Sequence, residues 1–173
     1  MQIYNRSEQI LRPAQLFYVW ASLIIALLLN FLPTQAWPGV PDWVALVLCI
    51  WMIRETRLVG MSWAFFLGVI MDVADAAVLG QHALAYVLLA FGAGGLSRRV
   101  QWFPLPQQGL HVMPLLVMVP LVQAVVRTVA GDDFPSWTYF ISPFVSTLLW
   151  MPMTILLLLP QLRPHERDDT RPI

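Results

Sequence analysis

Long apolar blocks separated by short polar connections make up most of this chain. Six blocks have the dimensions of membrane-crossing helices, at residues 14–32, 41–53, 58–73, 81–96, 109–130 and 139–162. The first, fifth and sixth can cross a bilayer with some tilt, because a transmembrane helix needs about 20 apolar residues. A few residues around 76–80 join the third and fourth, which we expect to form a tight helical hairpin. We predict an all-α integral membrane protein, with one six-helix transmembrane domain over residues 1–173.

The second block is short, since its apolar part covers only about 20 Å of helix. We expect Trp43 and Trp51 to lie at the two membrane interfaces, with the head group of Arg54 extending to water. Asp42 follows Pro41 at the start of this block, where a carboxylate favours a helix N-terminus.

The arginines orient the six spans. All ten basic residues are arginine. Nine of them fall on one side if six helices cross, at positions 6, 12, 54, 57, 98, 99, 163, 167 and 171. Basic residues concentrate in cytoplasmic segments, so both termini are predicted to be cytoplasmic. A count of five or seven spans would break this alternation.

Composition agrees with a bilayer environment. The chain is 58% hydrophobic and 12% charged, with a mean hydropathy of +0.67. Soluble domains carry about twice this charged fraction. The formal net charge is zero, so nothing indicates nucleic-acid binding.

One aspartate, Asp72, lies within the third apolar block. It continues a row of small residues at spacing four, which consists of Gly60, Ala64, Gly68, Ala76 and Gly80. Residues four apart share one helix face, and a face of small residues lets another backbone approach closely. Asp72 should therefore face protein rather than lipid, because a charge in contact with lipid is costly.

Arg127, the one arginine inside a span, is a candidate partner for Asp72 or Asp75, since all three are expected in the outer leaflet. Asp132 and Asp133 are competing partners, and Arg127 could also extend to water. Asp72 itself has two interpretations. It is a structural anchor between the third and fifth helices, or it lines a cavity or a partner surface.

Catalytic and metal-binding patterns are absent from the sequence. Asp72 and Asp75 lie on one helix, whereas an aspartyl protease needs two facing carboxylates. His82 and His111 are expected in opposite leaflets, so they cannot share a metal ion. We predict no enzymatic activity, no metal and no cofactor.

Three segments together resemble the rod-shape-determining MreD family. They are PDWVALVLCIW (41–51), FFLGVIMDVADAAVLGQHAL (65–84) and LLWMP (148–152). The family signature F-x-x-G-x-x-x-D with a following Leu-Gly maps onto Phe65, Gly68, Asp72, Leu79 and Gly80. The chain departs from the family pattern at Ala76, where the pattern has a glycine, and at Asp75, where it has a small or polar residue.

The resemblance implies a non-enzymatic protein of the bacterial inner membrane that acts in cell-wall elongation. It implies association with the bitopic protein MreC and, through it, with the MreB filament. It also implies work alongside a RodA-like glycosyltransferase and its penicillin-binding transpeptidase. The family is thought to share its fold with the substrate-binding S-components of vitamin ECF transporters.

Two hypotheses follow. In the first, the chain is a membrane scaffold that binds other helices through the surface formed by Gly60, Ala64 and Gly68 or through the proline-containing fifth and sixth helices. The cytoplasmic arginines then serve topology and contact with anionic lipids more than docking; they are Arg54, Arg57, Arg98 and Arg99. In the second, the chain is an ECF-type transporter subunit whose ligand pocket uses Asp72, Asp75, His82 and Arg127.

Overall fold

The computed structural model describes residues 15–32 and 39–161, which fold into six α-helices. They are α1 (Leu16–Asn30), α2 (Trp43–Arg54), α3 (Met61–Ala74), α4 (Gln81–Val100), α5 (Leu105–Val129) and α6 (Ser142–Leu158). Two short 3-10 helices, η2 (Trp137–Ile141) and η3 (Leu159–Gln161), flank α6. The prediction of six helices and no sheet is confirmed for the described residues.

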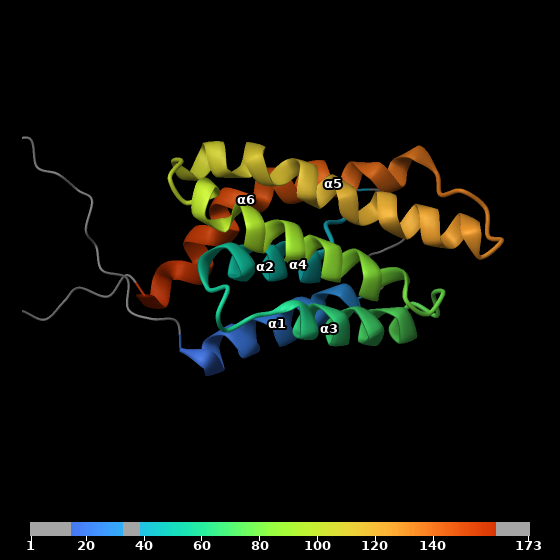
Figure 1. Cartoon of the computed structure of the whole chain (residues 1–173), viewed down its shortest axis with the longest axis horizontal. Helices are drawn as coiled ribbons and strands as arrows, with labels where there is room; N and C mark the ends of the chain where they lie inside the picture. Colours follow the sequence, from blue (N-terminus) through green and yellow to red (C-terminus); the bar gives the residue numbers. More distant parts are fainter. Residues whose placement is uncertain (1–14, 33–38, 162–173) are drawn as a thin grey trace, which may run out of the picture.

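Successive helices run in opposite directions between two ends of the bundle (Figure 1). The α2–α3 and α4–α5 connections lie at one end, which we name the arginine end because Arg54, Arg57, Arg98 and Arg99 lie there. The α3–α4 and α5–α6 connections lie at the other, which we name the hairpin end. The remaining predicted cytoplasmic arginines, at positions 6, 12, 163, 167 and 171, lie outside the described residues.

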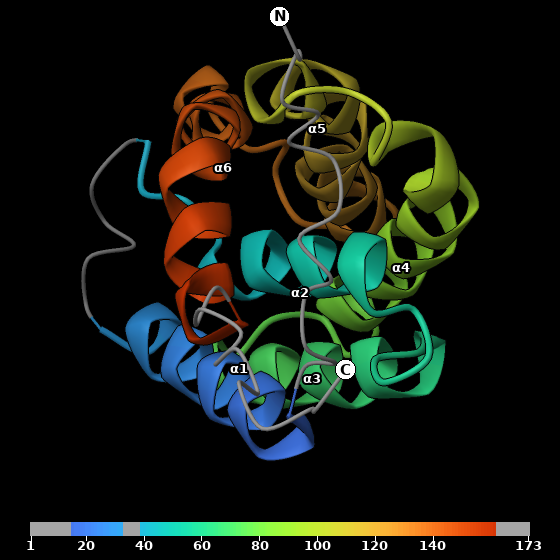
Figure 2. The same cartoon turned by 90° about the vertical axis from the view of Figure 1, so that its left-hand side faces the viewer.

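The short helix α2 occupies the centre of the bundle, as the end-on view in Figure 2 shows. Every residue from Val44 to Ile53 is buried, and α2 packs against α1, α4, α5 and α6. A helix that is apolar on all sides can be enclosed in this way, since no face needs water.

This central position corrects the expectation that Trp51 anchors an interface. Its side chain is fully buried, and its Nε1–H donates a hydrogen bond of 2.8 Å to Ser22 Oγ on α1. Trp43 lies in the first turn of α2, where its backbone N–H donates to Asn30 Oδ1 at 2.9 Å. Both ends of α2 are therefore bound to α1. At Trp51 a buried indole N–H needs a partner, and at Trp43 the side chain of Asn30 satisfies a backbone N–H in the first turn of the helix.

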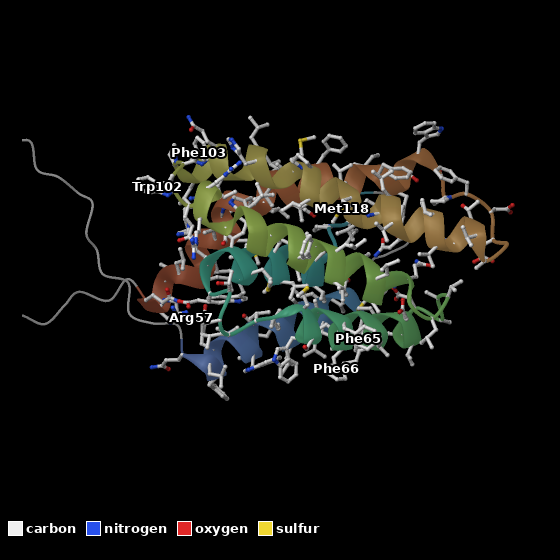
Figure 3. The ribbon with its side chains drawn as sticks, in the orientation of Figure 1. Arg57, Phe65, Phe66, Trp102, Phe103 and Met118 are labelled. Atoms are coloured by element: carbon white, nitrogen blue, oxygen red, sulfur yellow. The ribbon has the colours of Figure 1, made fainter. Side chains whose placement is uncertain are left out.

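Outward faces of the bundle are also apolar. Phe65 and Phe66 project from α3 (Figure 3), and Phe91 on α4 and Leu148 on α6 are more than two-thirds exposed. Two stretches within the described residues, Leu105–Val129 and Trp137–Gln161, are long and apolar enough to cross a membrane. Helices that are apolar both inside and outside are typical of proteins whose surroundings are lipid.

Candidate functional site

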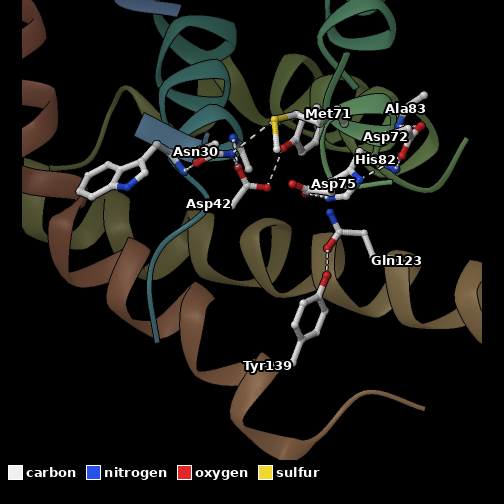
Figure 4. A network of polar contacts seen from close by, with 12 residues as sticks. Asn30, Asp42, Met71, Asp72, Asp75, His82, Ala83, Gln123 and Tyr139 are labelled. Atoms are coloured by element: carbon white, nitrogen blue, oxygen red, sulfur yellow. Dashed lines mark hydrogen bonds and ion pairs between the residues drawn. The ribbon is translucent and has the colours of Figure 1, made fainter. Parts of the chain in front are cut away.

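The carboxylate of Asp72 is fully enclosed at the hairpin end, as expected from its place in the row of small residues. Its Oδ1 accepts from the backbone N–H of His82 at 2.6 Å and from His82 Nδ1 at 2.9 Å. Its Oδ2 accepts from the backbone N–H of Gly80 at 2.8 Å and lies 3.4 Å from that of Ala83. The charge is thus surrounded by donors rather than by hydrocarbon (Figure 4).

These contacts make Asp72 the cap of the following helix. The first N–H groups of any α-helix lack partners within the helix and carry a partial positive charge. Gly80 is the N-cap residue of α4 and has no side chain to offer. A carboxylate from α3 supplies the missing acceptor, so Asp72 fastens the two arms of the hairpin to each other.

Close packing of α3 on α4 explains Gly68. A Cβ added there would lie 2.3 Å from the Cα of Ala83, so only glycine fits. Ala64, one turn earlier, is also fully buried, whereas a Cβ at Gly60 would meet nothing within 4 Å. The row of small residues therefore serves packing within this chain, and Ala64 and Gly68 are not open to a second protein.

The contacts of Asp72 also correct the prediction that it anchors the third helix to the fifth. Asp72 joins α3 to α4, and Arg127 lies 3.7 Å (Nε to Oδ2) from Asp132, whereas no ion pair joins Arg127 to Asp72 or Asp75. Both Asp72 oxygens are already occupied by the start of α4. Arg127 lies in the last turn of α5, and Asp132 follows in the next connection, so this local pair forms more readily.

The hairpin connection contains two residues with positive φ. Ala76 has a φ of 49°, and the N–H of Ala77 donates to the carbonyl of Asp72 at 2.9 Å, which closes the C-terminus of α3. This is the position that glycine usually takes at a helix C-terminus. Gly80 has a φ of 99°, and Leu79 before it is exposed. Ala76, where this chain departs from the glycine of the family pattern, is thus a position at which the backbone conformation favours glycine.

A second polar network joins α1, α2 and α4, and only its N-cap residue, Asp42, was predicted from the sequence. Asp42 Oδ1 accepts from the Asn30 side-chain amide at 2.9 Å and from the backbone N–H of Ala45 at 3.0 Å. Its Oδ2 accepts from the hydroxyl of Tyr86 at 2.7 Å. The signal for an N-cap was local, but no sequence spacing links Asn30 or Tyr86 to Asp42.

A cavity of about 710 Å³ lies at the hairpin end between these two networks. Asp75, His82 and Arg127 line it, whereas Asp72 lies behind His82 and outside the lining. The structure therefore brings three of the four residues of the transporter hypothesis to one cavity, and it assigns Asp72 to the helix cap instead.

At the opposite end the arginines differ from one another. Arg57, Arg98 and Arg99 are exposed, which agrees with contact to water or lipid head groups. Arg54 is half-buried, and its Nη2 donates to Gln108 Oε1 on α5 at 3.3 Å. Arg54 therefore also joins α2 to α5.

Comparison with known proteins gives one family match. The family model described as MreD, rod shape-determining protein, matches residues 12–159. No solved structure matches this chain. The match covers all of the helical bundle except the final 3-10 turn, so it includes the hairpin with Asp72 and the cavity.

Proposed function

Because this chain belongs to the MreD family of rod shape-determining proteins, we propose that it acts as a non-enzymatic scaffold of cell-wall elongation in the bacterial inner membrane. Family membership implies a role in determining rod cell shape, and together with the apolar helices it indicates a membrane protein. The family match over residues 12–159 is the observation that carries the proposal.

In this proposal the chain crosses the membrane six times, with both termini in the cytoplasm. Two features support this arrangement. The helices alternate in direction, and four of the five described arginines lie at the arginine end. The outward faces are apolar at mid-bundle, where lipid would surround them.

The partner surface that we propose is the outer face of α6. Phe144, Leu148, Met151 and Ile155 are exposed and recur at spacings of four, three and four. That is the seam with which one helix packs along another. We propose that it binds the transmembrane helix of an MreC-like bitopic protein, with membrane lipids around the remaining faces.

Through that partner the scaffold would reach the MreB filament, a RodA-like glycosyltransferase and a penicillin-binding transpeptidase. The fixed α3–α4 hairpin contributes rigidity, since Asp72 and Gly68 leave little freedom between its arms.

Site-specific photocrosslinking in the native membrane tests this surface. A benzophenone amino acid at Leu148 should crosslink to a bitopic membrane protein. The same probe at Phe91, which is similarly exposed but lies on α4, should not. Equal crosslinking from both positions, or none from Leu148, would refute the α6 surface.

The transporter-subunit hypothesis remains a second candidate because Asp75, His82 and Arg127 line one cavity. Purification in mild detergent from the native cells separates the two. A vitamin-like molecule that copurifies would favour the transporter subunit, whereas a bitopic helix protein would favour the scaffold.

A further inference from the structure

The cavity at the hairpin end contains a buried acceptor that the protein leaves unused. Gln81 is 5% exposed and lines the cavity, and its Oε1 has no hydrogen-bond partner among the described residues. Buried polar atoms are nearly always satisfied, because an unpaired acceptor loses its water without compensation. The oxygen is enclosed in this side-chain conformation, so rotation of the Gln81 side chain toward the cavity would present it to an N–H or O–H donor there.

The charges around the cavity favour a donor that carries a positive charge. Four carboxylates line it, from Asp42, Asp75, Asp132 and Asp133, against one arginine. Asp42 has both oxygens in hydrogen bonds, and Asp132 pairs with Arg127. Asp133 is exposed in the α5–α6 connection, so water screens its charge more than that of Asp75.

Asp75 differs from these paired carboxylates. Its contact is His82 Nε2 at 3.6 Å, and its side chain is 35% exposed. That distance is too long for a good hydrogen bond, so the Asp75 oxygens retain acceptor capacity. Figure 4 shows Asp75 and Gln123 facing the same space.

We propose that this cavity binds a small molecule that carries a protonated amine. The ammonium group donates hydrogen bonds to the Asp75 carboxylate and to the side-chain carbonyl of Gln81. A charge-assisted hydrogen bond to Asp75 supplies most of the affinity. Met71, Leu116 and Val119 line the same cavity and form an apolar wall for the carbon body of the ligand.

The size of the cavity favours a small molecule over a single basic side chain of a partner protein. At about 710 Å³ it falls within the range of pockets that enclose whole organic ligands. The ammonium group could belong to a soluble amine or to an amine-bearing lipid head group. The inference stands on the cavity and does not rest on the proposed scaffold function.

Binding of 4-fluorobenzylamine to the purified full chain in mild detergent, followed by ¹⁹F NMR, tests the proposal. The neutral isostere 4-fluorobenzyl alcohol should bind at least tenfold more weakly. Asp75→Asn and Gln81→Leu should each weaken amine binding at least tenfold. The matched control is Glu55→Gln, which removes one negative charge at the arginine end, and it should leave binding unchanged.

The Asp75 carboxylate and the Gln81 Oε1 atom make no short hydrogen bond with any described residue, so both variants should fold. Circular dichroism of each purified variant checks this. Equal affinity for amine and alcohol, unchanged binding in Asp75→Asn, or no amine binding at millimolar concentration would overturn the proposal. The last result would point to a basic partner segment instead.

Nanodiscs separate the two sources of the amine. Weaker probe binding in phosphatidylethanolamine than in phosphatidylcholine nanodiscs would support a lipid head group as the occupant. Equal binding in the two would support a soluble amine.

Discussion

Replacing Asp72 with asparagine tests whether this carboxylate fastens the α3–α4 hairpin. The amide keeps one oxygen, which can still accept from the backbone N–H and ring of His82. Its NH₂ group, however, replaces the oxygen that lies 2.8 Å from the N–H of Gly80. Two donors then face each other at the start of α4.

The size of the effect follows from these contacts. Loss of a hydrogen bond to a buried charge costs about 1.5–3 kcal/mol. Loss of the negative charge at the N-terminus of α4 adds about 0.3–1 kcal/mol, and up to about 2 kcal/mol in a buried setting. We therefore expect Asp72→Asn to lower the free energy of unfolding by about 2–5 kcal/mol.

Unfolding of the purified chain in mixed detergent micelles, with increasing SDS and circular dichroism as the readout, measures this difference. Asp133→Asn is the matched control, because Asp133 is exposed in the α5–α6 connection. It should change stability by less than about 0.5 kcal/mol. If Asp72→Asn were as mild as this control, Asp72 would not be a helix cap. A double-mutant cycle that combines Asp72→Asn with His82→Phe should also show a coupling free energy above about 0.5 kcal/mol, since the two side chains are hydrogen-bonded.

Three further variants test other features of the same region, and unfolding in detergent measures each. Gly68→Ala should destabilise by more than about 2 kcal/mol through overpacking against Ala83, whereas Gly60→Ala should be near neutral; equal effects would contradict the close approach. The effects of Asp72→Asn and Arg127→Ala on the free energy of unfolding should add within about 0.5 kcal/mol. A larger coupling would indicate that Asp72 and Arg127 interact, which the structure does not show. Ala76→Gly should stabilise by up to about 1 kcal/mol by relieving a positive φ, and destabilisation would refute that strain.

Helix number and order were predictable because each helix coincides with an apolar run. The boundaries of α4 and α5 were less predictable. α4 continues to Val100, past Arg98 and Arg99, since cations in the last turn favour a helix C-terminus. α5 begins at Leu105, four residues earlier than expected, because Pro106 is tolerated in a first turn.

The environment of single residues was predictable only where it depended on position within one helix. Spacing of four placed Asp72 with Gly68 on an inward face, and the structure buries both. The position of Trp51 near the end of a short apolar block placed it at an interface, which is wrong because burial of α2 depends on its neighbours. Arg127 was assigned by depth in the membrane, and depth alone did not decide between Asp72 and Asp132.

By itself the sequence determined six apolar helices, their alternation and the inward direction of Asp72, because hydrophobic length and helical period are local properties. Only the tertiary structure decided that α2 is central, that Asp72 caps α4 and that Asp75 and Gln81 line one cavity. The physical reason is that these features depend on which helices are neighbours. The backbone N–H groups that bind Asp72 are present in almost every residue, so no sequence pattern marks them.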